Sequence, residues 1–109
     1  MKAEEARFMW LFVFFDLPVG TKDQRRRANR FRNFLKDDGY MMLQFSVYAR
    51  VCRGQDAVEK HVKRARSSLP DEGSIRSLQI TDKQFGRMEL MLGTAPKNER
   101  VGPSQMVLL

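Results

Sequence analysis

The sequence is poor in the residues that form disulfides and metal clusters. It contains one cysteine, Cys52, and one histidine, His61. A single cysteine excludes a disulfide within the chain, and the two residues fall short of the ligand set of a zinc site. We therefore expect Cys52 to pack in the core, His61 to be a packed or solvated side chain, and the protein to occupy a reducing compartment.

The chain also lacks a long apolar run. Its longest, residues 8–15, is far shorter than the roughly 20 residues that a membrane-spanning helix needs. The run is preceded by Glu4 and Glu5 and followed by Asp16 and Pro18, which does not fit a secretory signal. These features predict a cytoplasmic protein with no membrane partner.

Acidic residues are in the minority. The chain has 20 Lys and Arg against 13 Asp and Glu, for a formal net charge of +7. Such a balance favours polyanionic partners, nucleic acid above all, although a merely basic soluble protein is the alternative. Its 109 residues suit one domain with a modest core that a second subunit can enlarge.

The apolar run predicts a central strand that ends on a carboxylate. Residues 8–15 are few for a helix, rich in aromatic side chains, and closed by Asp16, Leu17 and Pro18. Both faces of this strand are apolar and must be covered, by helices on one side and most simply by a second subunit on the other. Asp16 is a candidate metal ligand, and the cationic segment that follows places it next to a phosphate-binding surface.

That cationic segment predicts an amphipathic helix. Thr21 and Gln24 have capping-box spacing, and the helix should run to about Asp38, before Gly39. One side of this helix is an apolar stripe, made of Ala28, Phe31, Phe34 and Leu35. The opposite half is cationic and carries Lys22, Arg25, Arg26, Arg30 and Lys36. Arg27 projects toward the apolar side, where we expect an internal ion pair, and Arg32 lies at the margin.

Most of the net charge lies on this helix. Residues 21–37 hold seven Lys and Arg against Asp23 and Asp37, a local charge of 7 − 2 = +5. A solvated surface helix normally mixes both signs through i,i+4 pairs. The cationic half therefore predicts contacts with phosphates rather than bases, with an affinity that falls steeply as salt is added.

The remaining segments predict further strands and helices. Residues 40–52 alternate between apolar and polar side chains, as one bent strand or two joined tightly. Residues 54–69 have the spacing of a second helix, and residues 75–80 suggest a strand. A short turn or helical piece should begin at Thr81 and run through Phe85, and residues 88–92 alternate again.

The order of these elements is that of an α+β, ferredoxin-like βαββαβ sandwich. We expect this domain to span residues 1–93. Residues 94–109 should form a linker and an additional C-terminal strand, because the apolar end at residues 105–109 is too exposed to remain unpaired. The strand is expected to add to a sheet edge, on the partner subunit.

Four motifs follow one another along the chain: the apolar strand ending Phe15-Asp16-Leu17-Pro18, the helix pattern from Arg25 to Leu35, the segment from Gly39 to Tyr48, and Thr81-Asp82-Lys83-Gln84-Phe85. Together they resemble the family of CRISPR-associated adaptation proteins called Cas-two. The resemblance covers residues 8–92 and is greatest to the variety that accompanies type II systems.

This resemblance implies a homodimer of ferredoxin-like domains whose sheets face each other. In the family, such a dimer bridges two dimers of the integrase Cas-one and holds a short DNA duplex, the prespacer, for insertion into a CRISPR array. The cationic residues Lys22, Arg25, Arg26, Arg30 and Lys36 would then clamp the duplex without reading its sequence. The C-terminal strand would pair at the dimer or integrase interface.

The resemblance also implies a nuclease. Many members are described as metal-dependent nucleases acting on RNA or DNA, which makes Asp16 the implied catalytic residue and ligand of Mg²⁺ or Mn²⁺. Ser46 is implied to orient the phosphate or a water. One carboxylate per chain, with no second acid beside it, is poor equipment for hydrolysis. A structural Asp16, which accepts backbone N–H groups at the turn, is the alternative.

Three other functions share the same features. A sheet-surface RNA-binding protein could use the aromatic side chains for stacking, but the RNP1 pattern is absent. A toxin-type messenger-RNA endonuclease of related fold would also use an acidic strand end. A non-catalytic nucleic-acid-binding module needs only the cationic helix.

Overall fold

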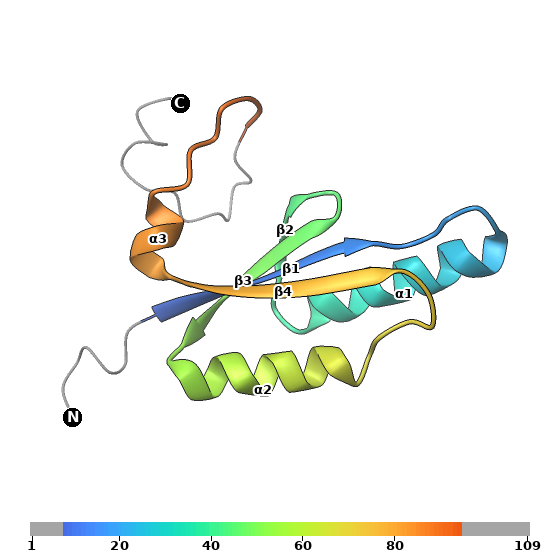
Figure 1. Cartoon of the computed structure of the whole chain (residues 1–109), viewed down its shortest axis with the longest axis horizontal. Helices are drawn as coiled ribbons and strands as arrows, with labels where there is room; N and C mark the ends of the chain where they lie inside the picture. Colours follow the sequence, from blue (N-terminus) through green and yellow to red (C-terminus); the bar gives the residue numbers. More distant parts are fainter. Residues whose placement is uncertain (1–7, 95–109) are drawn as a thin grey trace.

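The computed structural model describes residues 8–94 (Figure 1). Its elements are β1 (Phe8–Asp16), α1 (Lys22–Asp37), β2 (Met41–Gln44), β3 (Val47–Arg53), α2 (Gln55–Arg66), β4 (Ser74–Thr81) and α3 (Asp82–Gly86). The C-terminal strand expected at residues 105–109 lies outside the described residues, so the boundary between domain and tail at residue 93 stays a prediction.

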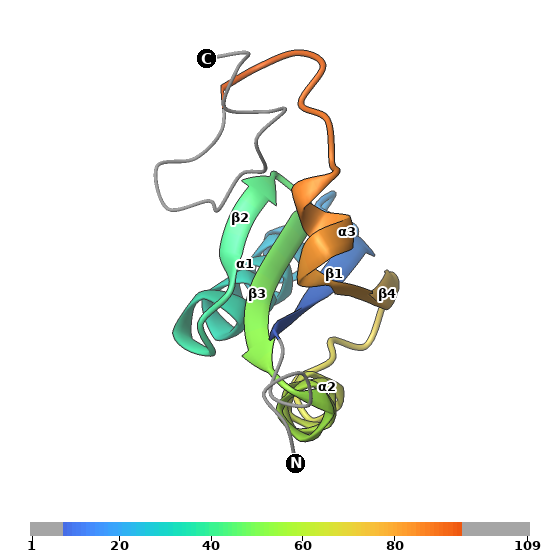
Figure 2. The same ribbon diagram turned by 90° about the vertical axis from the view of Figure 1, so that its left-hand side faces the viewer.

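The four strands form one antiparallel sheet in the order β2-β3-β1-β4, with β2 and β4 at the edges (Figure 2). Helices α1 and α2 lie on one side of the sheet and α3 on the other (Figure 1). Each long helix joins two strands that are separated by a third strand of the sheet. This is the split βαβ arrangement, and the expected ferredoxin-like α+β fold is confirmed.

Strand β1 buries both of its faces, as its sequence predicts. Leu11, Val13 and Phe15 pack under the long helices, whereas Trp10 and Phe12 belong to a cluster on the opposite face. On that second face, α3 covers one end of the sheet. The Phe85 ring stacks on the Trp10 ring with centroids 3.9 Å apart, and Trp10 Nε1 donates a hydrogen bond to Asp82 Oδ1.

Helix α1 begins and ends where its sequence predicts. Thr21 Oγ1 accepts from Gln24 N at 3.1 Å and Gln24 Oε1 accepts from Thr21 N at 3.0 Å, which completes the capping box. The helix ends at Asp37, with Asp38 as its cap, and Gly39 follows with a φ of 92°. Its buried face consists of Ala28, Phe31 and Leu35.

Residues 40–52 form two strands rather than one. A turn at Phe45 and Ser46 separates β2 from β3, and the pairing register shifts between Met42 and Gln44. Sequence alone left this open because the turn contains no glycine, proline or asparagine. The register shift lies directly before this turn, and the Phe45 side chain in the turn is 69% exposed.

One expected helix is shorter than its pattern suggested, and one alternating segment forms no strand in the described part of the chain. Helix α2 ends at Arg66, so Leu69 lies beyond the helix and is half exposed, and Pro70 prevents the helix from continuing. The alternating segment is residues 88–92. Alternation alone does not make a strand, because a strand also needs backbone hydrogen bonds to a neighbouring strand, and residues 88–92 pair with no strand in the described part of the chain.

Cys52 and His61 are both buried in the core. Cys52 belongs to the buried cluster under the long helices, which confirms the packing role predicted for it, and this burial raises the pKa of its thiol. His61 Nδ1 lies 2.8 Å from Asp38 Oδ2, and Arg64 Nη1 donates to Asp38 Oδ1 at 2.8 Å. These contacts connect Asp38, the C-cap residue of α1, to two side chains of α2.

The Asp38 cluster predicts a pH dependence of stability. Burial opposes ionisation of the carboxyl group, but the hydrogen bonds from His61 and Arg64 outweigh it and lower the pKa of Asp38 below its ordinary 3.8. A lowered pKa means that the stabilisation is complete above pH 3.8 and is lost as the pH falls through the folded-state value. We expect Asp38→Asn to reduce the free energy of unfolding at pH 7 by about 1–3 kcal/mol.

Urea denaturation at several pH values checks this expectation. The difference in unfolding free energy between wild type and Asp38→Asn should shrink as the pH falls below the ordinary carboxyl value, because the wild-type carboxylate becomes protonated. Asp37→Asn, a change at the exposed neighbouring acid, is the matched control and should have little effect. A difference that stays constant down to strongly acidic pH would contradict the role given to Asp38.

Candidate nucleic-acid interface and acidic strand end

The predicted metal ligand Asp16 lies exposed at the end of β1, opposite Ser74 of β4. Side chains alternate along a strand, so Asp16 lies on the same face as Phe12 and Phe14. Helix α1 covers the other face. Asp16 therefore does not point toward the cationic helix that follows it, but toward the side of the sheet that the two long helices leave uncovered.

The Asp16 carboxylate makes no hydrogen bond or ion pair within residues 8–94. A structural role in the turn would require such bonds, so the described contacts do not support that alternative. The backbone at this point is nevertheless tightly fixed. Gly73, with a φ of +102°, packs so closely that a Cβ there would lie 2.8 Å from the Asp16 carbonyl oxygen.

Ser46, the second predicted site residue, is brought to the same end of the sheet. It lies in the turn between β2 and β3, and its carbonyl oxygen accepts a hydrogen bond from Phe15 N at 3.1 Å. Phe15 directly precedes Asp16. The fold thus places Ser46 next to the residue that precedes Asp16, although Ser46 and Asp16 are 30 positions apart in the sequence.

The donor set at this end of the sheet does not suit a metal that needs three or four protein ligands. In the described part of the chain, no three His, Cys, Asp or Glu side chains come together as metal ligands. A zinc site needs three or four such ligands, whereas Mg²⁺ takes one or two carboxylates and keeps several waters. Asp16, exposed and without a protein partner among residues 8–94, fits Mg²⁺ or Mn²⁺ with a shell made largely of water.

Arg76 is a site candidate that the sequence analysis missed. It is exposed on β4 and pairs in register with Phe14, so it lies on the Asp16 face. Ser74 is the direct partner of Asp16, which makes Arg76 its diagonal neighbour, at roughly 7–8 Å. The alternation of residues 74–81 was the only available signal. It could not be used before the pairing of β1 with β4 was known.

The five cations predicted to bind phosphates are all exposed on α1: Lys22, Arg25, Arg26, Arg30 and Lys36. Arg25 Nη1 donates to the Val19 carbonyl oxygen at 3.1 Å, and Arg26 forms a surface pair with Asp23 at 2.9 Å. From the first to the last, the row spans about 21 Å at 1.5 Å per residue. Figure 1 shows that β1 points toward the side of the molecule where α1 begins, and a short loop connects the two elements.

The other two arginines of α1 are engaged within the fold. Arg27 pairs with Glu72 at 3.0 Å, which confirms the internal ion pair that its position predicts. Arg32 stacks on the exposed ring of Phe45, with its guanidinium carbon 3.9 Å from the ring centroid. The cationic face available to a ligand is thus the row of five.

The sheet face that carries Asp16 is apolar and only partly covered. Its half-buried and exposed side chains are Phe14, Met41, Leu43, Val47, Val51, Leu78 and Ile80. The two central aromatic residues, Trp10 and Phe12, are buried, so they are not available as stacking platforms for RNA bases. The structure therefore does not favour the sheet-surface RNA-binding alternative.

Fold and site together define a small ferredoxin-like protein with an exposed acid on one face of its sheet and a cationic helix on the other. The chain belongs to the family of the CRISPR associated protein Cas2, whose model matches residues 9–88. The resemblance found in the sequence is thereby confirmed.

Known relatives support the family over nearly the whole chain. A CRISPR-associated endoribonuclease Cas2 of Flavobacterium psychrophilum is 48% identical over 108 residues, which cover 99% of this chain and 93% of that protein. Another of Acidovorax ebreus is 48% identical over 101 residues, or 92% and 99% of the two chains. A crystal structure of a Cas2 protein has a TM-score of 0.57 at 18% identity and covers 85% of this chain and 94% of its own, which supports the fold.

Among residues 8–94, no helix combines the length and the apolar character that crossing a bilayer requires.

Proposed function

We propose that the chain is the small, homodimeric subunit of a CRISPR spacer-acquisition complex. It binds duplex prespacer DNA through the phosphates, independently of sequence, and bridges dimers of the integrase Cas-one. The observation that carries this proposal is the exposed row of five cations on the outer face of α1. Lys and Arg side chains on a helix surface neutralise phosphates, and their binding energy does not depend on base sequence.

The uncovered sheet face supports the homodimer. One face of the sheet is closed by α1 and α2, whereas the other exposes Leu78 by 51% and leaves Phe14 and Val47 half-buried. A second copy that presents the same face would bury both apolar surfaces around a two-fold axis. The same arrangement would place two Asp16 side chains on the shared face. Each chain alone offers only one.

In the proposed dimer, the two cationic helices could contact the same duplex. Because α1 lies on the outer side of each sheet, the two helices would remain exposed when the opposite faces meet. Each contributes a row about 21 Å long, and a duplex presents one phosphate charge per roughly 1.7 Å of its axis. Two such rows suit a ruler-like clamp on a short duplex.

A charge placed on the uncovered face tests this assembly. Leu78→Lys leaves the single chain intact because the side chain is already half exposed. In a dimer it would bury a lysine, and we expect the dissociation constant of the dimer to rise by about 100-fold or more. Sedimentation equilibrium should find wild type at twice the 12.7 kDa of the chain and the variant at the single-chain mass.

Met42→Lys is the matched control, because Met42 is 46% exposed on the other edge strand and shares the helix-side face with Tyr48. It should stay dimeric. Co-purification with Cas-one and a duplex should then succeed for wild type and Met42→Lys and fail for Leu78→Lys. A wild-type chain that sediments as a monomer, or an assembly that Leu78→Lys leaves intact, would contradict the proposal.

A second candidate function is a metal-dependent endonuclease centred on Asp16. The relatives are named as endoribonucleases, and the exposed carboxylate without a protein partner in the described part of the chain favours this activity. When bound, Mg²⁺ or Mn²⁺ would polarise a phosphodiester and lower the pKa of a bound water. In this chain Asp16 would hold the ion, Ser46 would orient a phosphate or water, and Arg76 would attract the phosphate. RNA is the first substrate to test and DNA the second.

A further inference from the structure

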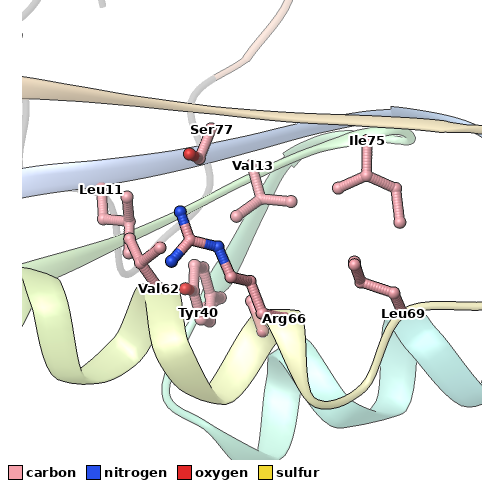
Figure 3. A pocket seen from close by; sticks show the side chains of 9 residues that line it. Leu11, Val13, Tyr40, Val62, Arg66, Leu69, Ile75 and Ser77 are labelled. Carbon is pink, nitrogen blue, oxygen red and sulfur yellow. The ribbon is translucent and has the colours of Figure 1, made fainter.

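A cavity of about 260 Å³ lies between α2 and the sheet, on the face opposite Asp16 (Figure 3). Most of its wall is apolar and consists of Leu11, Val13, Val62, Ala65, Leu69 and Ile75. Three polar side chains complete the lining: Tyr40, Arg66 and Ser77.

Tyr40 contributes a buried hydroxyl group. The residue is 5% exposed, and its Oη has no hydrogen-bond partner in the described structure. Burial raises the pKa of this hydroxyl group, with Asp38 adding to the effect, so the group stays neutral and can donate a hydrogen bond. Buried polar groups are nearly always satisfied, and this one lines a cavity that can hold a partner for it.

The polar groups gather at one end of the cavity. In Figure 3, Arg66 extends from α2 toward Ser77 on β4, and the Tyr40 hydroxyl lies at the same end, whereas Ile75 and Leu69 line the other. Arg66 is exposed and makes no ion pair within residues 8–94. A guanidinium group and two hydroxyl groups favour an anionic acceptor at that end, and the aliphatic side chains favour a hydrocarbon body.

We propose that this cavity is a binding site for a small amphipathic organic anion, whose carboxylate contacts Arg66, Ser77 and Tyr40 and whose aromatic or branched body lies against Leu69 and Ile75. A cavity of about 150 Å³ holds benzene, so this volume accommodates on the order of ten non-hydrogen atoms. Ligand sites commonly combine such an apolar wall with a few convergent polar groups. The inference does not depend on the function proposed for Asp16 or α1.

Phenylacetate is a suitable probe, because it joins a carboxylate to an aromatic ring and has the expected size. Titration of the full chain, followed by amide chemical shifts in NMR spectra, should give saturable shifts at millimolar probe, centred on Val62, Ala65 and Ser77. Phenylacetamide has the same shape without the charge and should bind about tenfold more weakly or worse.

Three variants sharpen the test. Arg66→Gln should weaken phenylacetate binding by about tenfold or more and abolish its preference over phenylacetamide. Lys63→Gln removes a cation from the same helix outside the cavity lining and should leave the affinity unchanged. Tyr40→Phe should weaken binding while the unfolding free energy stays the same or rises, because the change removes a buried hydroxyl group that has no partner in the described structure.

The combination of weaker binding and undiminished stability in Tyr40→Phe separates a binding role from a structural one. Absence of saturable shifts would overturn the proposal. This is also the result expected if another segment or subunit fills the cavity. Equal binding of the two probes, or shifts centred away from α2 and β4, would overturn it as well.

Discussion

The double substitution of Arg25→Glu and Arg26→Glu is expected to lower the affinity of the chain for duplex DNA by about 100-fold or more at low salt. The double reversal changes the charge of α1 by −4, and it does so in the N-terminal half of the exposed row. Arg25 and Arg26 are both exposed, and their contacts with Val19 and Asp23 are surface contacts, so the fold should persist. Fluorescence anisotropy with duplexes of two unrelated sequences should give the same loss for both.

A double reversal on the other long helix controls for net charge. Lys60→Glu combined with Lys63→Glu changes the charge by the same amount at two exposed positions of α2. We expect its effect on duplex affinity to stay within about threefold at moderate salt, because a charge more than a Debye length from the phosphates is largely screened. Equal losses for the two helices would mean that net charge, rather than the face of α1, attracts DNA.

The second large effect is expected for Asp16→Asn, which should reduce metal-dependent cleavage of RNA by about 1,000-fold or to background. The amide keeps the shape of the side chain but is a far weaker ligand for Mg²⁺. The Asp16 carboxylate makes no hydrogen bond within residues 8–94, so the unfolding free energy should change by no more than about 0.5 kcal/mol. Cleavage of labelled RNA and DNA in Mg²⁺, Mn²⁺ or chelator measures the effect.

Asp23→Asn, at another exposed acid, should cleave at the wild-type rate. If Asp16→Asn retained the activity of the wild type, the cleavage would come from a contaminant and the nuclease proposal would be wrong. Spacer integration with Cas-one should persist in Asp16→Asn, because α1 and the apolar side chains of the sheet face are unchanged. Loss of both activities in a folded variant would show that the scaffold also depends on this carboxylate.

Several elements could be predicted from sequence because local chemistry determines them. The capping box of Thr21 and Gln24 and the glycine at position 39 define α1 within a residue at either end. The position of α1 in the fold also leaves its five cations exposed, as the helical periodicity predicts. The two-sided apolar composition of β1 likewise predicted a strand covered on both faces.

Features that depend on tertiary pairing could not be predicted in the same way. The register of β1 against β4 determines which face of the sheet carries Asp16, and it makes Arg76 the diagonal neighbour of Asp16. The pairing of His61 with Asp38 joins residues of two elements that have no shared periodicity. The cavity beside Tyr40 depends on how far α2 stands from the edge of the sheet, and composition gives no information about that distance.

The most direct test of the central claim is the salt dependence of duplex binding by the wild-type protein, which we propose to be a dimer. If about five of the ten cations on two α1 helices contact phosphates, the logarithm of the binding constant should fall with the logarithm of salt concentration at a slope near −4.5. The slope should be the same for unrelated sequences and shallower for the Arg25 and Arg26 double variant. A wild-type slope close to zero would contradict phosphate binding by α1.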